Sequence, residues 1–200
     1  ILLLEISVKL TESRKLAAAE FSRLLEEKAR LLGMPNLRFE VELVPRPEID
    51  ETGAEQICFL FSANKNQSMQ PVAEVASGGE ISRLMLCLKA LIAHVTVLPT
   101  IIFDEVDTGV SGEVADKMGD IMQEMSRYMQ VISITHLPQV ASKGRHHYRV
   151  YKQDTEISTQ THIEELKDRK RIEEIARMLS GAKLTDEAMN NARVLLGKNI

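Results

Sequence analysis

Apolar residues recur at helical spacing along residues 2–32, which predicts one long N-terminal helix. One column of a heptad repeat is apolar throughout, at positions seven residues apart: Leu3, Leu10, Ala17, Leu24 and Leu31. The companion column is apolar only at Ile6, whereas a two-stranded coiled coil needs both columns. The pattern therefore predicts the last turns of a coiled coil that merges into a helix packed on a domain. A plain amphipathic surface helix is the open alternative.

The period of the pattern changes after Gly33 and Pro35. Residues 37–44 alternate apolar and charged side chains, as a half-buried antiparallel strand does, and residues 56–62 form a second apolar run. The prolines and acidic residues at 45–53 favour a loop between these strands. A β-hairpin is therefore expected before the middle of the chain.

The second half of the chain alternates strands and helices. Two short runs, 100–104 and 131–135, are continuously apolar, which is typical of buried parallel strands. Helical spacing precedes the first run at 79–96 and joins the two at 112–129, so we expect a βαβ unit with a right-handed crossover. Two strands and two helices are expected to close the chain: 147–153, 156–163, 168–179 and 184–196. The predicted fold class is α/β, with a mostly parallel sheet flanked by helices.

Composition narrows the classes of protein that fit this pattern. The chain has 200 residues, 44% of them hydrophobic, and a net charge of −4, which argues against a basic surface that coats nucleic acid. No run of eighteen apolar residues occurs, so we expect no membrane-spanning helix. Cys58 and Cys87 lack metal-like spacing and are expected to be reduced residues of a cytosolic protein. Because the chain opens inside a predicted helix without a Met, we expect it to be part of a longer protein.

Two adjacent carboxylates, Asp104 and Glu105, directly follow the first apolar strand. The carboxyl end of a parallel strand is where open α/β sheets bind ligands. One acid there can hold Mg²⁺ through its water shell, and a neighbour that points the other way along the pleat can polarise an attacking water. We therefore predict a magnesium role for Asp104 and a general-base role for Glu105. A strand that simply ends in polar residues is the alternative.

The stretch Ser77-Gly78-Gly79-Glu80 leads straight into the helix predicted at 79–96. Glycines let backbone N–H groups approach an anion closely, and a helix N-terminus adds about half a positive charge. Ser77 can cap the helix and donate its hydroxyl to a phosphate oxygen. The stretch therefore predicts a phosphate-binding helix N-terminus, and an ordinary helix cap is the alternative.

His136 follows the second apolar strand, so we expect it at the same sheet edge as Asp104 and Glu105. There its ring could hydrogen-bond a γ-phosphate or the attacking water, and a structural histidine is the alternative. Basic residues also gather at 143–147 and 167–171. Both clusters could contact DNA phosphates, although in a chain of net charge −4 they are more commonly solvated turns and helix starts.

The order and spacing of the three main elements resemble the ABC ATPase superfamily. Residues 76–80 are similar to its signature motif, 101–105 to its Walker B motif, and 134–136 to the segment of its switch histidine. Residues 106–112 fall where these ATPases carry the D-loop. Within the superfamily, Ser-Gly-Gly-Glu-Ile-Ser-Arg and Phe-Asp-Glu-Val-Asp-Thr-Gly-Val-Ser-Gly most resemble RecN, a family of bacterial SMC-like DNA repair ATPases, and the resemblance spans nearly the whole chain. Where SMC and transporter D-loops usually end in Asp, this chain has Ser111, in agreement with RecN.

The resemblance implies the C-terminal lobe of an ABC/SMC-type P-loop NTPase head. Residues 1–32 would be a coiled-coil stub that leads into the head, and residues 33–200 the lobe itself. ATP and Mg²⁺ would be the cofactors, with Asp104 holding the metal through water and Glu105 and His136 acting in catalysis. The residues implied to bind the nucleotide are Ser77, Gly78, Gly79, Glu80 and Asp107.

No P-loop sequence, Gly-x-x-x-x-Gly-Lys-Ser/Thr, occurs in the chain. In RecN-like proteins this loop lies in an N-terminal lobe, so the resemblance implies three partners in the full-length protein: that lobe, a second head in an ATP-sandwich dimer, and DNA, with no membrane. It also implies a role in double-strand-break repair and recombination, a cytoplasmic, nucleoid-associated location, and no ATP hydrolysis by this chain alone. Two alternatives stay open: the head lobe of another SMC-like chromosome-tethering or recombination ATPase, and a catalytically silent lobe that binds DNA or a partner.

Overall fold

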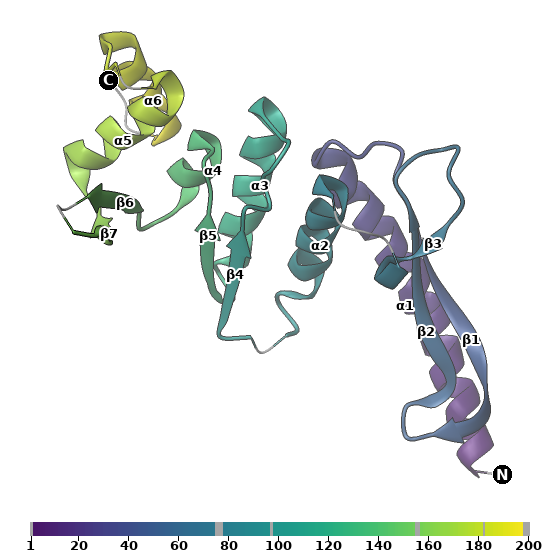
Figure 1. The fold of residues 1–200 in the computed structure, drawn as a ribbon. Coiled ribbons are helices and arrows are strands. Elements are labelled where there is room, and N and C mark those ends of the chain that lie inside the picture. The colour runs from purple at the N-terminus through teal and green to yellow at the C-terminus, as the bar shows by residue number, and fades with distance from the viewer. Residues whose placement is uncertain (1, 75–77, 97, 155–156, 182, 198–200) are drawn as a thin grey trace. The chain divides into compact units, whose positions relative to one another are not determined.

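The computed structural model describes residues 2–74, 78–96, 98–154, 157–181 and 183–197. The chain divides into two compact units, Ile1–Thr96 and Val97–Ile200 (Figure 1). Helices and strands occur in both units, as the predicted α/β class requires. No helix in the described part of the chain is long and apolar enough to cross a membrane.

The first unit is a long helix packed on a β-hairpin. Helix α1 (Leu2–Leu31) precedes strands β1 (Arg38–Asp50) and β2 (Gly53–Ser62), which pair antiparallel. Three further elements complete the unit: β3 (Gln70–Pro71), the 3₁₀ helix η1 (Val72–Glu74) and helix α2 (Gly79–Ile92). Helix α2 is shorter than predicted, because it ends at Ile92 whereas the apolar spacing predicted an end at residue 96.

Aromatic and aliphatic side chains hold the C-terminal half of α1 against the hairpin. The ring of Phe21 lies 6.1 Å from that of Phe39 in β1 and 6.3 Å from that of Phe59 in β2, centroid to centroid. Leu25 and Ala29, one and two turns further along α1, are fully buried. Aromatic pairs at such distances add about 0.5–1.5 kcal/mol beyond the area they bury. The N-terminal turns of α1, in contrast, expose large apolar side chains: Leu2, Leu3, Leu4, Ile6 and Val8.

A buried ion pair fastens the hairpin turn to the N-terminal half of α1. Arg14 Nη1 lies 3.1 Å from Glu55 Oε2, and the Glu55 carboxylate, 9% exposed, also accepts a hydrogen bond from the Thr11 hydroxyl. Arg14 donates a second hydrogen bond to the Thr52 carbonyl at 2.5 Å. Since removing one partner would leave a charge buried without its counterion, this contact is costly to break.

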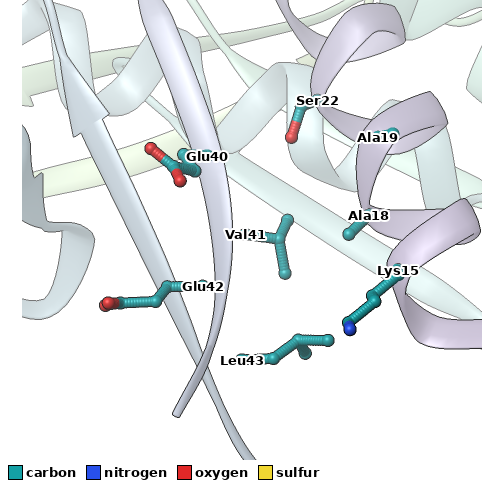
Figure 2. A pocket seen from close by; sticks show the side chains of 8 residues that line it. All are labelled: Lys15, Ala18, Ala19, Ser22, Glu40, Val41, Glu42 and Leu43. Atoms are coloured by element: carbon teal, nitrogen blue, oxygen red, sulfur yellow. The ribbon is translucent and has the colours of Figure 1, made fainter. Parts of the chain in front are cut away.

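Between these two contacts a shallow groove separates α1 from β1 (Figure 2). Val41 and Leu43 point toward α1, whereas Glu40 and Glu42 point away from it. The facing residues of α1 include Ala18 and Ala19, whose short side chains leave the space between helix and strand unfilled.

The hairpin is longer than the sequence predicted, and the loop expected at 45–53 is wrong. Strand β1 continues through Pro45 and Pro47 to Asp50. Proline lacks an N–H donor, but β1 is an edge strand of the sheet β1-β2-β3, so one side of its backbone needs no partner. The pairing register shifts between Pro45 and Asp50, and this irregularity accommodates the prolines.

The second unit begins with the predicted βαβ arrangement. Strands β4 (Thr100–Asp104) and β5 (Gln130–Ile134) are parallel and are joined by helix α3 (Gly112–Met125). The remaining elements are α4 (Pro138–Lys143), β6 (Tyr148–Asp154), β7 (Thr159–Glu165), α5 (Asp168–Ser180) and α6 (Asp186–Leu195). Among the described strands, only β4 and β5 pair parallel. Strands β6 and β7 pair antiparallel, because the segment between them is too short for a crossover connection.

Helix α4 lies directly before the basic cluster at 143–147, in a segment where the sequence predicted no helix. Pro138 occupies its first turn, a position where the missing N–H costs nothing. The end of α4 is held by Arg171 of α5, which donates to the carbonyls of Ser142 at 3.0 Å and Gly144 at 2.5 Å. Gly119 of α3 lets α3 and α4 approach closely, since a Cβ at this position would lie 2.8 Å from the Cγ of Lys143 in α4.

Among the described residues, only one face of the β4–β5 sheet is covered. Phe103 is 6% exposed, whereas Ile102, Ile132 and Ile134 are 62%, 42% and 53% exposed. The continuous apolar runs predicted strands that are buried on both faces, and the structure differs from this on the second face. Ile102 and Ile132 are paired in register, so their exposed side chains form one apolar surface.

Candidate functional site

The polar residues that follow β4 and β5 lie at one edge of the parallel sheet. Asp104 is paired in register with Ile134, and the N–H of Glu105 donates to the Ile134 carbonyl at 3.1 Å, which extends the pairing by one residue. His136 follows two residues later. The side chains of Asp104, Glu105 and His136 are all exposed, so this edge presents two carboxylates and an imidazole to solvent.

Glu105 has an unusual backbone conformation, with φ of 47°. Such values are uncommon for residues other than glycine and cost on the order of 1–3 kcal/mol. The Glu105 carbonyl accepts hydrogen bonds from the backbone N–H of Thr108 at 3.2 Å and from its hydroxyl at 2.9 Å. The strand therefore ends at Asp104 with a sharp turn. The alternating pleat, which was expected to point the two carboxylates in opposite directions, does not extend to Glu105.

Asp107 in the turn after β4 is buried, with only 1% of its side chain exposed. Its Oδ2 accepts a hydrogen bond from the Thr135 hydroxyl, whose oxygen accepts one from the Leu137 N–H at 3.0 Å. Its Oδ1 lies 3.8 Å from Nδ1 of His136 and has no hydrogen-bond partner among the described residues. This carboxylate thus links the turn after β4 to the segment after β5.

The burial of Asp107 bears on the nucleotide contact that the resemblance implied. A side chain that is 1% exposed offers a nucleotide no free oxygen at the surface. The geometry therefore favours contacts of Asp107 with side chains inside the protein. His136, in contrast, is exposed at the sheet edge. Thr135 was not identified from sequence as a functional residue, and its only sequence signal is a hydroxyl-bearing side chain directly before the histidine.

The glycine-rich stretch belongs to the first unit, at the start of α2. The helix begins at Gly79, and its N-cap is Gly78 rather than Ser77, which lies outside the described residues. Gly78 provides no side-chain cap, so among the described residues no side chain caps the first N–H groups of α2, which can then bind an anion. A Cβ at Gly78 would meet nothing within 4 Å in the described part of the chain, and Glu80 is exposed one residue into the helix.

The described residues hold no group of three or more His, Cys, Asp or Glu side chains arranged as a metal site. Mg²⁺ in phosphate-processing sites is usually held by one or two carboxylates together with waters and substrate phosphates. An exposed Asp104 at the sheet edge is a donor of this type. Both cysteines are free, and burial raises the pKa of Cys87 to about 12, which disfavours the thiolate form that binds metals.

The basic cluster at the start of α5 is engaged in contacts within the chain. Lys167 lies 3.1 Å from Glu165, Arg169 lies 2.9 Å from Glu173, and Lys170 pairs with Glu164. Lys143, from the other basic cluster, lies between Asp116 and Asp120 at 2.9 and 2.7 Å. These pairs favour the interpretation as helix starts and turns over contact with DNA phosphates.

Comparison with solved structures defines the class of the fold. The chain is similar to the Smc head domain of Pyrococcus yayanosii, with a TM-score of 0.64 and 20% identity over 88% of this chain and 32% of that one. It also resembles a solved SMC ATPase chain studied for ATP-driven dimerization and DNA-stimulated activation, with a TM-score of 0.51 and 15% identity over 88% of this chain and 99% of that one. No family model matches the chain. The fold is that of an SMC head domain.

Within this class the sequence is RecN-like. DNA repair protein RecN from Haemophilus influenzae is 37% identical over 188 residues, 94% of this chain and 34% of the relative. The RecN proteins of Halalkalibacterium halodurans and Rickettsia felis are 39% and 38% identical over 95% and 96% of this chain. The resemblance to RecN is therefore confirmed, and the chain spans about a third of the length of these relatives.

Proposed function

We propose that this chain is the C-terminal lobe of the ATPase head of a RecN-like DNA repair protein, acting in double-strand-break repair and recombination. Residues 1–32 would lead from a coiled coil into the head, and residues 33–200 would form the lobe. The observation that carries the proposal is the common sheet edge at which Asp104, Glu105 and His136 are exposed. This edge is where α/β folds bind ligands, and the fold is that of an SMC head.

Each exposed side chain at this edge has a distinct task in ATP hydrolysis. Asp104 would hold magnesium through its water shell, and the metal when bound would neutralise charge on the phosphates. Glu105 would accept a proton from the attacking water, and the exposed ring nitrogen of His136 would accept a hydrogen bond from the same water. The tight turn at Glu105 supports this assignment, because strained backbone at such an edge is often found at functional sites.

The site would be completed by groups from outside this chain. The P-loop, absent here, would come from the N-terminal lobe of the same head. The exposed isoleucines of the β4–β5 sheet support such a neighbour, because they form an apolar surface that another layer could cover. Ser77, Gly78, Gly79 and Glu80 would contact a nucleotide held by a second head, since in the described part of the chain nothing fills the space beside Gly78 and no side chain caps the first N–H groups of α2.

DNA would be a partner of the full-length protein, and it would not bind through the basic clusters of this chain. The relatives are named DNA repair proteins, and the related SMC ATPases were studied for DNA-stimulated activation. A cytoplasmic, nucleoid-associated location follows from this role. The match to RecN over almost the whole chain favours this family over other SMC-like heads, and the exposed catalytic trio argues against a silent lobe.

The substitution Glu105→Gln tests the central assignment. With a P-loop lobe supplied, we expect ATP hydrolysis to fall by about 100-fold or more, because an amide cannot accept the proton from water. ATP-dependent association of heads should persist and can be measured by gel filtration. This chain alone should show no ATP turnover, since it has no P-loop.

Glu48→Gln, at an exposed glutamate in the other unit, is the matched control and should hydrolyse ATP at the parent rate. Parent-like turnover by Glu105→Gln would exclude Glu105 as the base. Appreciable turnover by this chain without a P-loop lobe would contradict the division of the site between two lobes.

A further inference from the structure

A buried carboxylate beside an exposed histidine is not explained by the assignments above. Asp107 is 1% exposed, and its Oδ1 is a buried atom without a hydrogen-bond partner in the described part of the chain. Leaving a buried polar atom unpaired is costly, so such an atom calls for an explanation. Nδ1 of His136 lies 3.8 Å from this oxygen.

The second oxygen of this carboxylate is held firmly in place. The Thr135 hydroxyl donates a hydrogen bond to Asp107 Oδ2 and accepts one from the Leu137 N–H at 3.0 Å. The direction of the first bond follows from chemistry, because an ionised carboxylate can only accept and the hydroxyl has one proton to give. The oxygen Oδ1 is therefore presented at a fixed place next to the imidazole.

This arrangement selects one tautomer of the histidine. An ionised carboxylate can only accept, so it favours a proton on the ring nitrogen that faces it, which is Nδ1. The other nitrogen, Nε2, then lacks a proton when the ring is neutral and lies on a side chain that is 66% exposed. The separation of 3.8 Å exceeds hydrogen-bond length, and catalytic hydrogen bonds are often long before a ligand binds.

We propose that Asp107, held by Thr135, is a positioning residue that orients His136 and fixes its proton on Nδ1. The tautomer depends on this geometry alone, whereas its effect on catalysis rests on the proposed ATPase function. Asp107 then keeps Nε2 of His136 aimed outward with a defined protonation state. The buried aspartate of the serine proteases acts on its histidine in the same way, and its exchange for asparagine there produces the wrong tautomer.

The substitution Asp107→Asn should reverse this preference without changing the shape of the side chain. The Thr135 hydroxyl can still donate to the amide oxygen, which leaves the NH₂ group facing Nδ1 of His136. Because an NH₂ group donates, Nδ1 would become the acceptor and the proton would move to Nε2. Thr135→Val should release the carboxylate and reduce the preference, whereas Thr135→Ser keeps the hydroxyl and should retain it.

The tautomer is measured by ¹⁵N side-chain NMR of this chain at about pH 8, where an ordinary imidazole is neutral. We expect Nδ1 protonated in the parent and in Thr135→Ser, and Nε2 protonated in Asp107→Asn. The signals of His136 are assigned by their loss in His136→Gln. Asp120→Asn, which replaces a carboxylate paired with Lys143 on α3, is the matched control and should leave the tautomer unchanged.

An unchanged tautomer in both Asp107→Asn and Thr135→Val would overturn the proposal. If Asp107→Asn does not fold, an unchanged tautomer in Thr135→Val is sufficient to overturn it. In a head supplied with its P-loop lobe, Asp107→Asn should also lower the ATP turnover number by about 10-fold or more, with ATP binding retained. A reversed tautomer together with parent-like turnover by Glu105→Gln would uphold the positioning role and reject the proposed ATPase site.

Discussion

The three aspartate and glutamate side chains near the end of β4 lie in two environments, exposed and buried, and these environments suit different tasks. Asp104 and Glu105 are exposed, so they are free to meet a hydrated metal and a water molecule. Asp107, two residues beyond Glu105, is buried against Thr135 and His136. A buried carboxylate serves best by orienting a neighbour, since a charge without water needs a partner inside the protein.

A second histidine provides a test of the second unit at the scale of a single residue. Burial and the nearby Arg171 guanidinium hold the pKa of His147 below its usual value, so the folded state takes up a proton less readily than the unfolded state. Stability from this residue is therefore present above about pH 6.5 and is lost as the pH falls below that value.

We expect His147→Gln to reduce the loss of thermal stability between about pH 7.5 and pH 5.5, because glutamine has no proton to bind. The measurement is the melting temperature by circular dichroism at several pH values. Gln160→Asn, an exposed change on β7 that involves no titratable group, is the control and should keep the pH dependence of the parent. An identical slope for the parent and His147→Gln would contradict a partly buried, neutral His147 in the folded state.

At the scale of helices, two glycines serve different purposes. Gly78 precedes α2, where a Cβ would meet nothing within 4 Å among the described residues, so the space is open to an incoming group. Gly119 lies within α3, where a Cβ would come 2.8 Å from Lys143 Cγ and 3.3 Å from the Gln139 carbonyl. The first glycine is therefore suited to ligand approach and the second to helix packing.

This difference predicts that substitution by alanine affects pairing at Gly78 and stability at Gly119. Gly78→Ala should cost no more than about 1 kcal/mol of stability, yet weaken ATP-dependent pairing of heads by about 10-fold, because a methyl group would block close approach to the helix N-terminus. Gly119→Ala should destabilise the chain by about 1–2 kcal/mol, since overpacking against α4 outweighs the gain in helix propensity.

Chemical denaturation measures the stability of both variants, and gel filtration with ATP and a P-loop lobe measures pairing. Gly119→Ala acts as the control for pairing, because its folded fraction should pair as the parent does. Normal pairing by Gly78→Ala would remove the argument that the open space at this glycine receives the nucleotide of a second head.

At the scale of the whole molecule, the exposed face of the β4–β5 sheet offers an apolar surface that a further layer could cover. Ile102 and Ile132 are paired in register and are 62% and 42% exposed. Large apolar side chains gathered on one sheet face are usually covered in the functional protein. The P-loop lobe is the partner that the proposed function requires at this place.

The double substitution Ile102→Ser and Ile132→Ser should leave the chain folded but weaken its association with a P-loop lobe. Losing the burial of two isoleucines costs about 2–3 kcal/mol, which corresponds to roughly 30–140-fold in affinity. The affinity is measured by isothermal titration calorimetry. Val150→Ser with Ile163→Ser, a register pair of exposed residues on β6 and β7, is the matched control and should bind as the parent does. Equal affinities for the two double variants would contradict a docking role of the β4–β5 face.

Sequence patterns were most informative where neighbouring residues determine the structure. The helical spacing after Gly112 and the apolar runs at 100–104 and 131–135 predicted the βαβ unit, because period and burial are local properties. Local rules failed in the hairpin, where Pro45 and Pro47 were expected in a loop. Their place on an edge strand is decided by which strands pair, and that is a property of the sheet.

The site, like the fold, has features that depend on neighbouring residues and features that depend on the tertiary structure. The sequence by itself determined the residues that end β4 and β5, and with them a sheet edge carrying Asp104, Glu105 and His136. Only the tertiary structure decided that Asp107 is buried, that Thr135 donates to it, and that Glu105 adopts a positive φ. The physical reason is that Thr135 and Asp107 are 28 residues apart in sequence, and the burial of a carboxylate depends on which segments the fold places around it.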